Sequence, residues 1–180
     1  MQTTELICST KDGFHVPQLA FGLYKVSKSE CKTVVCNAIL AGYRHFDCAP
    51  AYENEREVGE ALSFMIHDGI VTRKDLYICS KVWKDAVTSG RNAVRQSIEN
   101  SIADLCCEYL DLAMIHWPVQ SHIDAYKELE LMVHEGKIRS LGLSNYFPEV
   151  SVITIFKRCE LQWVETKLFE PCFATTSQGL

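Results

Sequence analysis

The sequence lacks any long hydrophobic run. It contains no stretch of about 18 consecutive apolar residues, the length at which a helix crosses a bilayer. The first residues, MQTTELICSTKDG, show neither the basic nor the apolar region of a signal peptide. We therefore expect neither membrane insertion nor secretion, and we predict a cytoplasmic protein.

Clustered basic residues and paired cysteine motifs are also missing. The 18 Lys and Arg residues are spread along the chain and the formal net charge is -5, which disfavours binding to nucleic acid. The nine cysteines are odd in number and scattered, without a C-x-x-C pair, so neither a zinc site nor a redox dithiol is indicated. We expect free thiols in a reducing compartment and no metal site.

What is present is the composition of an ordinary globular protein. Hydrophobic residues make up 47% of the 180 residues and charged residues 23%, which supplies enough apolar material for one buried core. No low-complexity segment or linker divides the chain. We predict a single domain over residues 1–180.

Short apolar runs rich in strand-forming residues recur along the chain. They are LAFGLY (19–24), YRHFD (43–47), LYICS (76–80), LDLAMIH (110–116), IRSLGLS (138–144) and LQWVE (161–165). A spacing of roughly 30 residues between such strands is typical of parallel strands joined by helical crossovers. The pattern predicts an α/β fold.

Helical spacing of apolar residues marks several of the intervening segments. The predicted helical faces are Val34, Ala38 and Ala41 after a capping box (Ser27-x-x-Glu30); Val94, Ile98, Ile102 and Leu105; and Ala125, Leu129, Met132 and Val133, with Gly136 as C-cap. Pro148 is placed to begin a further helix. These segments supply the crossovers between the predicted strands.

Two α/β architectures compete for this pattern. A doubly wound nucleotide-binding sheet carries a Gly-rich phosphate turn after its first strand, but neither G-x-G-x-x-G nor G-x-x-x-x-G-K-[ST] follows residues 19–24. The absence favours a parallel (βα)8 TIM-barrel type. Before the barrel, an Asp12-Gly13 turn between two alternating segments predicts an N-terminal β-hairpin that closes the barrel floor.

Polar residues follow the apolar runs where the chemistry of a barrel enzyme is found, at the carboxyl ends of the strands. Asp47 ends the second strand, Ser80-Lys81 the third, His116 the fourth and Ser144-Asn145 the fifth, and Tyr52 lies in the loop after Asp47. Singly, each is more often a helix cap, a turn residue or a solvated charge. Together, on successive strands, they indicate one site.

An acid, a phenol, an ammonium and an imidazole combine into a proton donor for a carbonyl oxygen. A nearby Lys81 favours the anion of Tyr52 and makes the proton of the phenol easier to give up. Asp47 would keep the buried ammonium charged. His116 would orient the substrate oxygen, provided that its other ring nitrogen has a partner. A lyase or isomerase that uses Lys81 as a Schiff base is a weaker alternative.

Four motifs carry a resemblance to the aldo-keto reductases, nicotinamide-dependent (βα)8-barrel oxidoreductases. Residues 42–59, GYRHFDCAPAYENEREVG, resemble the family's G-[FY]-R-x-x-D-x-A-x-x-Y-x-N-E-x-x-V-G segment. YICSKVW (77–83), LDLAMIHWP (110–118) and GKIRSLGLSNY (136–146) resemble its later strand-end motifs, in the same order. The similarity extends over nearly the whole chain.

The resemblance implies roles for the residues that match. It implies a catalytic tetrad of Tyr52, Asp47, Lys81 and His116; an NADPH site that includes Gly22, Leu23, Tyr24, Asp47, Ser144 and Asn145; and a substrate pocket lined by Tyr24, Trp83, His116 and Trp117. The large aromatic residues point to apolar or aromatic carbonyl compounds as substrates, with barrel-rim packing as the alternative for the two tryptophans.

The sequence departs from the family pattern in three places. Where the family has N-Q-x-E, the chain reads Leu161-Gln162-Trp163-Val164-Glu165, so Gln162 is displaced by one position and faces the other side of a strand. The link VQSHID after the fourth strand is short. A complete barrel needs about 250 residues, so we expect an incomplete, apparently C-terminally truncated barrel of about six strands.

These features support NADPH-dependent reduction of aldehydes or ketones to alcohols, with a tyrosine as proton donor. The alternative is a non-catalytic truncated homologue or binding subunit that retains the tetrad but cannot hold the cofactor. The family resemblance implies a monomer that acts on a small-molecule carbonyl substrate. Exposed edges of an incomplete barrel would instead favour self-association.

Overall fold

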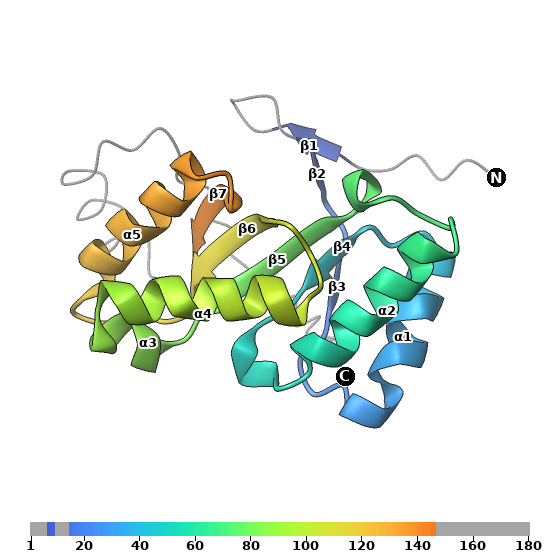
Figure 1. The fold of residues 1–180 in the computed structure, drawn as a ribbon, viewed down its shortest axis with the longest axis horizontal. Coiled ribbons are helices and arrows are strands. Elements are labelled where there is room, and N and C mark those ends of the chain that lie inside the picture. The colour runs from blue at the N-terminus through green and yellow to red at the C-terminus, as the bar shows by residue number, and fades with distance from the viewer. Residues whose placement is uncertain (1–6, 10–14, 147–180) are drawn as a thin grey trace, which may run out of the picture.

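The computed structural model describes residues 7–9 and 15–146. A small antiparallel sheet pairs β1 (Ile7–Ser9) with β2 (His15–Pro17), which confirms the predicted N-terminal β-hairpin (Figure 1). Its turn at Asp12-Gly13 lies outside the described residues. The strand predicted at 161–165, with the displaced Gln162, and the helix predicted at Pro148 also lie outside them.

A second, larger sheet contains five parallel strands that pair in chain order. They are β3 (Ala20–Gly22), β4 (His45–Asp47), β5 (Tyr77–Val82), β6 (Leu110–Ile115) and β7 (Ile138–Leu143). Each overlaps one of the apolar runs. The central strands β5 and β6 are buried at almost every position, as expected for parallel strands that are covered on both faces. The parallel α/β fold is confirmed.

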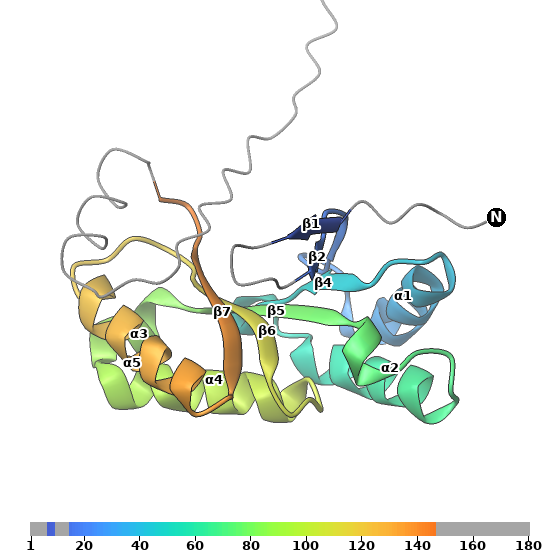
Figure 2. The ribbon, with the colours of Figure 1, turned by 90° about the horizontal axis from the view of Figure 1, so that it is seen from above.

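Five helices connect the strands and lie on one side of the parallel sheet. They are α1 (Lys28–Leu40), α2 (Glu55–His67), α3 (Lys84–Ser89), α4 (Arg91–Asp104) and α5 (His122–His134). Figure 2 shows α2, α3, α4 and α5 below the sheet, α1 beside β4, and the hairpin above the sheet. A doubly wound sheet carries helices on both faces, so this arrangement is that of a barrel wall. Among the described residues, no helix combines the length and apolar character needed to cross a membrane.

Helix α1 forms where expected, but the predicted capping box and helical face are partly wrong. The Ser27 hydroxyl donates to the Glu30 carboxylate (2.5 Å) and does not cap the helix backbone. The buried stripe is Cys31, Val35, Ala38 and Ile39, whereas Ala41 is the exposed C-cap residue. Apolar residues occur on several faces of this helix, so the sheet decides which face is buried.

The predicted faces of α4 and α5 lie against the core. Val94, Ile98 and Leu105 are fully buried, as are Ala125, Leu129 and Met132. At the end of α5, Gly136 has a φ of 74°, and the amides of Gly136 and Lys137 donate to the carbonyls of Val133 and Met132. This is a Schellman motif, which confirms Gly136 as the residue that ends the helix.

Helix α2 was not among the predicted helices. Its core-facing residues, Val58, Ala61, Leu62 and Met65, are buried and recur at helical spacing. The signal is present in the sequence but is obscured by the charged run Glu55-Arg56-Glu57 at the beginning of the helix. This helix follows the loop that carries Tyr52, so its position bears directly on the site.

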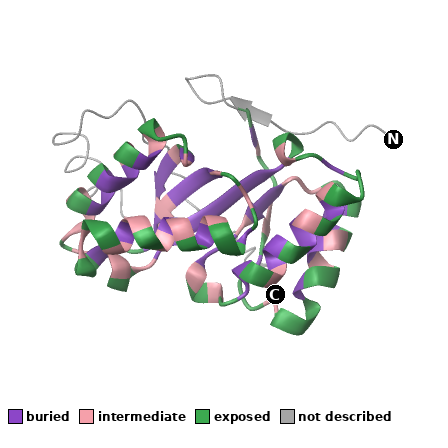
Figure 3. Ribbon diagram, viewed as in Figure 1, coloured by how far each residue is buried: buried purple, intermediate pink, exposed green. Residues whose placement is uncertain are grey.

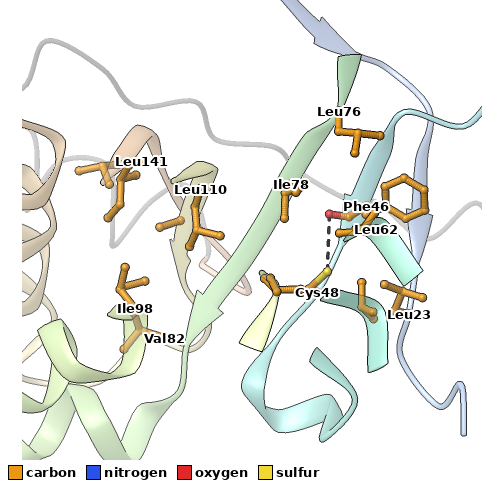
Figure 4. Packing of buried hydrophobic residues seen from close by; sticks show 14 of the residues in the cluster. Leu23, Phe46, Cys48, Leu62, Leu76, Ile78, Val82, Ile98, Leu110 and Leu141 are labelled. Carbon is orange, nitrogen blue, oxygen red and sulfur yellow. Dashed lines mark hydrogen bonds between the residues drawn. The ribbon is translucent and has the colours of Figure 1, made fainter. Parts of the chain in front are cut away.

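The core occupies both faces of the parallel sheet. The larger cluster lies between sheet and helices, where Phe46, Ile78 and Leu110 of adjacent strands pack together (Figures 3 and 4). On the opposite face, Val16 of the hairpin packs with Tyr77, Cys79 and Leu112. The hairpin therefore closes that face at the amino ends of the strands, as the sequence predicted.

A network of ion pairs around the buried Asp111 joins the amino ends of β5, β6 and β7. The Asp111 carboxylate accepts hydrogen bonds from Arg73 (2.8 Å), Arg139 (3.2 Å) and the backbone amide of Ile78 (2.9 Å). Both guanidinium groups also lie over the Tyr109 ring, at 3.9 and 4.0 Å from its centroid. In a barrel, this end of the strands contributes stability.

Gly59 marks the closest approach of α2 to the end of α4. A Cβ atom at this position would lie 2.1 Å from the carbonyl oxygen of Asp104, so the two backbones would have to move apart. We expect Gly59→Ala to lower the free energy of unfolding by about 1–3 kcal/mol, although alanine favours helices. Urea denaturation measures the change.

The neighbouring, exposed Glu60 supplies the control for this variant. Glu60→Ala should change stability by no more than about 0.5 kcal/mol. A Gly59→Ala protein as stable as the wild type would show that the helices are not held in contact there.

Candidate active site

The predicted polar residues meet at the carboxyl ends of the parallel strands. Asp47 is the last residue of β4, Lys81 is the last residue but one of β5, and His116 directly follows β6. Ser144 and Asn145 directly follow β7. Because parallel strands end at the same edge of a sheet, residues far apart in the chain share one mouth.

Lys81 lies at the centre of this cluster. Its side chain is 5% exposed, and its ammonium donates to Asp47 Oδ1 (2.5 Å), the Cys48 carbonyl (2.9 Å) and the Tyr52 hydroxyl (3.1 Å). Burial by itself lowers the pKa of Lys81, but Cys79, Asp47 and Tyr52 together raise it above its usual value. The ammonium therefore stays charged despite its burial.

The Tyr52 phenol is half-buried beside this ammonium. Its hydroxyl donates to Asp47 Oδ2 at 3.5 Å. Burial raises the pKa of Tyr52, Lys81 lowers it and Asp47 raises it, and the net direction is upward. The lowering by Lys81 that the sequence indicated is therefore present, but the loss of solvent, which the sequence does not show, outweighs it. The phenol keeps its proton at neutral pH.

His116 contacts the aromatic residues of the mouth. Its ring centroid lies 5.0 Å from that of Trp83, 6.2 Å from that of Tyr52 and 6.3 Å from that of Trp117. Burial, followed by the charge of Lys81, lowers the pKa of His116 to about 4. The ring is neutral at physiological pH. Its buried Nδ1 has no hydrogen-bond partner, so the partner expected from the sequence is not found among the described residues.

The residues predicted to line the substrate pocket form a continuous aromatic rim. Trp83 is half-buried, whereas Trp117 is 43% exposed and Tyr24 is 63% exposed. The Tyr24 and Tyr52 ring centroids are 5.2 Å apart, so the rim continues from Tyr24 through Tyr52 and His116 to the two tryptophans. The exposed rings leave apolar surface available for a small organic molecule.

Ser144 and Asn145 lie beside His116. The Asn145 side-chain amide donates to the His116 carbonyl (2.8 Å) and to Ser144 Oγ (3.1 Å). Asn145 has a φ of 62°, a left-handed conformation that asparagine tolerates better than most residues. Its Oδ1 atom has no partner among the described residues and is free to accept a hydrogen bond.

Leu23 and Ser80 lie at the strand ends, but their side chains point away from the mouth. Leu23 is fully buried in the core between sheet and helices, and its amide and carbonyl are bonded to Asp47, Val26 and Asn54. Ser80 precedes Lys81 in β5 and faces the helices, where its hydroxyl donates to Glu55 (2.5 Å). Gly22 pairs with Asp47 at the edge of the mouth.

Three residues at the site were given no role by the sequence. The Asn54 side chain is fully buried and donates to the carbonyls of Leu23 and Val26, both at 3.0 Å. Glu55 is buried at the start of α2, and the Cys79 thiol donates to Asp47 Oδ1 at 3.6 Å. The pair Asn54-Glu55 stands in the segment that resembles the family motif, which is the one signal that could have found them.

No group of three or more His, Cys, Asp or Glu side chains in the described part of the chain is arranged to hold a metal ion. The polar groups at the mouth are instead a buried ammonium, its carboxylate, a protonated phenol and a neutral imidazole. The fold and this site together define a protein of the (βα)-barrel class with a cluster of ionisable and aromatic side chains at the carboxyl ends of its strands.

Comparison with known proteins makes the class specific. The Aldo/keto reductase family model matches residues 18–160, and the chain belongs to this family. An NADPH-dependent D-xylose reductase of Meyerozyma guilliermondii is 35% identical over 161 residues, covering 74% of this chain and 50% of the relative. A methylglyoxal reductase of Escherichia coli O157:H7 is 35% identical over 143 residues, covering 78% and 49%.

Solved structures agree with the sequence relatives. An aldo-keto reductase of Bombyx mori in complex with NADP superposes with a TM-score of 0.84 at 27% identity, covering 91% of this chain and 58% of that one. The aldose reductase of Schistosoma japonicum gives 0.80 at 29% identity, covering 91% and 60%. The barrel-type fold is therefore confirmed. The chain spans about half the length of the curated relatives that it matches.

The contacts of Lys81 predict how the Tyr52 phenol titrates. Lys81→Met removes the charge that lowers the pKa of Tyr52, so this pKa should rise further. Asp47→Asn removes a charge that raises it, so the pKa of Tyr52 should fall. NMR titration of protein labelled at tyrosine Cζ measures both changes, with Tyr52→Phe to assign the signal.

Lys74→Met is the matched control, because Lys74 is exposed and lies just before the amino end of β5, at the opposite end of the strand from the site. It should leave the titration of Tyr52 unchanged. Shifts of the same sign in Lys81→Met and Asp47→Asn would contradict the charge arrangement described.

The lowered pKa of His116 predicts a pH-dependent stability. Histidine in an unfolded chain titrates near 6.5, whereas His116 in the folded protein titrates at about 4. Between these values the unfolded state binds the proton and the folded state does not. The stability that the neutral ring contributes is thus present above about pH 6.5 and is lost as the pH falls towards 4.

We expect His116→Gln to flatten the decline in free energy of unfolding between pH 7 and about 4.5. Urea denaturation across this range makes the measurement. The exposed His134, the last residue of α5, provides the control, and His134→Gln should keep the wild-type slope. An unchanged slope in His116→Gln would show that the ring titrates normally.

Proposed function

We propose that this protein reduces aldehydes or ketones to alcohols with NADPH, and that Tyr52 is the proton donor. The observation that carries the proposal is the position of the Lys81 ammonium. It lies 2.5 Å from Asp47 Oδ1 and 3.1 Å from the Tyr52 hydroxyl. The names of the relatives support it, since one is an NADPH-dependent D-xylose reductase and another a methylglyoxal reductase.

The chain offers groups that fit a nicotinamide cofactor. Asn145 Oδ1, which has no described partner, can accept a hydrogen bond from a carboxamide, and the Ser144 hydroxyl lies beside it. Gly22, Tyr24 and Asp47 lie along the same edge and would complete the contacts. The role that the resemblance implied for Leu23 is not part of the proposal, because its side chain is buried and its amide and carbonyl are already hydrogen-bonded. When bound, NADPH supplies a hydride to the carbonyl carbon.

Tyr52 performs the proton step. The pKa of Tyr52 lies above its usual value near 10, so the phenol carries a proton at neutral pH and can transfer it to a carbonyl oxygen that gains negative charge. The adjacent Lys81 ammonium then stabilises the tyrosinate, and Asp47 keeps Lys81 in place and charged. One proton leaves the Tyr52 hydroxyl and forms the O–H bond of the alcohol.

His116 and the aromatic rim position the substrate. A neutral imidazole has one N–H that can donate to the carbonyl oxygen without competing for the proton of Tyr52. Tyr24, Trp83 and Trp117 bound the opening on the other sides. Their surfaces favour a carbonyl compound with an apolar or aromatic substituent.

NADPH titration tests this proposal. Saturable quenching of tryptophan fluorescence with a dissociation constant below about 10 μM should accompany aldehyde-dependent oxidation of NADPH. Tyr52→Phe should abolish the oxidation but retain the binding, because it removes the proton and keeps the ring.

The control variant is Tyr43→Phe. Tyr43 lies just before the amino end of β4, at the opposite end of the strand from Asp47, and the variant should keep wild-type activity. Binding without turnover in the wild type would exclude the reductase activity. Absence of saturable binding would favour the second candidate, a non-catalytic homologue or binding subunit that retains the four site residues.

A further inference from the structure

Glu55 is a buried carboxylate for which the proposed reaction has no use. It is the first residue of α2 and is 5% exposed. Its two oxygens accept hydrogen bonds from the hydroxyls of Ser80 (2.5 Å) and Ser101 (2.9 Å). Burial raises the pKa of Glu55, and the two serine hydroxyls oppose this. Burying a carboxylate costs free energy of desolvation, so the presence of a glutamate at this position calls for an explanation.

The two serines belong to different elements. Ser80 lies in β5 and Ser101 in α4, so Glu55 joins the start of α2 to a strand and to a neighbouring helix. Side chains alternate along a strand. The Ser80 hydroxyl therefore faces the helices while the next residue, Lys81, reaches into the mouth. Glu55 thus binds β5 on the helix side of the sheet, at the residue that precedes Lys81.

On its other side, Glu55 is three residues from Tyr52. The intervening Asn54 is bonded to the carbonyls of Leu23 and Val26. The short 3-10 turn that carries Tyr52, Pro50–Tyr52, is therefore followed by two consecutive anchored side chains. One anchor fixes the turn to the loop after β3, and the other fixes it to β5.

A cavity of about 510 Å³ borders Glu55 on the helix side of the sheet. Lys28, Arg56, Ser97, Ser101 and Asp104 contribute to its wall. A shorter side chain at position 55 would therefore extend an existing space and would not create a closed void. Substitution should loosen the attachment of the Tyr52 turn without collapsing the core.

We propose that Glu55 is a positioning residue that sets Tyr52 against Lys81 by fixing the start of α2 to Ser80 and Ser101. The inference rests on the proposed function, in which the Tyr52 proton and the Lys81 charge must act on the same oxygen. It adds a role for a residue that contacts neither substrate nor cofactor. A misplacement of about 1 Å in such an arrangement can reduce a rate by about 100-fold.

Two measurements test whether Glu55 fixes the start of α2, and one of them does not depend on catalysis. The first is the NMR signal of Tyr52 labelled at Cζ, compared with that of Tyr109 at the other end of the strands. The second is the separation of kcat from KM for NADPH and a carbonyl substrate. The variants are Glu55→Ala, Glu55→Gln and Ser101→Ala, and the control is Glu57→Gln, which changes another glutamate of α2 that borders the cavity but has no described hydrogen bond.

In Glu55→Ala we expect the Tyr52 signal to shift or broaden, with the Tyr109 signal unchanged. The kcat should fall about 10- to 100-fold, and both KM values should stay within about twofold, since no binding contact is lost. Glu55→Gln should lose less, because its amide can accept from one serine and donate to the other. Ser101→Ala, which removes one bond, should lie between the wild type and Glu55→Ala.

An unchanged Tyr52 signal in Glu55→Ala and Ser101→Ala would overturn the proposal, as would an equal effect in Glu57→Gln. If Glu55→Ala does not fold, Ser101→Ala and Glu55→Gln decide the matter by the same two readouts. If the wild-type protein shows no reductase activity, the proposed function fails. The Tyr52 signal still decides whether Glu55 holds the turn.

Discussion

The ion pair between Lys81 and Asp47 is the interaction on which the rest of the site depends. A buried ammonium is tolerated only with a close counter-ion and further acceptors, and here Asp47, the Cys48 carbonyl and the Tyr52 hydroxyl supply them. The same positive charge opposes the rise in the pKa of Tyr52 and helps to keep His116 neutral. At both groups burial has the larger effect, and the charge of Lys81 opposes it at Tyr52 and adds to it at His116.

Strand β5 connects this electrostatic centre to the packing of the domain. All six of its residues are buried, with Cys79 and Lys81 on the side of the mouth and Ile78 and Val82 on the side of the helices. The polar exception on the helix side is Ser80, which bonds to Glu55. Hydrogen bonds on both faces of β5, from Ser80 to Glu55 and from Lys81 to Asp47, therefore fix the strand beside the mouth.

Much of the fold could be predicted from local sequence because parallel strands buried on both faces are continuous apolar runs. Helix boundaries and faces were less predictable. In α1, apolar residues occur around the helix, and the position of the sheet selected Cys31 and Val35 for burial over Ala41. In α2, the charged first turn hides the apolar stripe, because Glu55 is itself part of the buried interior.

By itself, the sequence determined which chemical groups stand at the strand ends, since residue types and strand order are local properties. It thereby identified Asp47, Tyr52, Lys81 and His116 as one cluster. Only the tertiary structure decided the direction of the pKa of Tyr52, the burial of Leu23 and the attachment of Glu55 to Ser80 and Ser101. Loss of solvent depends on segments distant in the chain, and its effect on Tyr52 exceeds that of the adjacent charge.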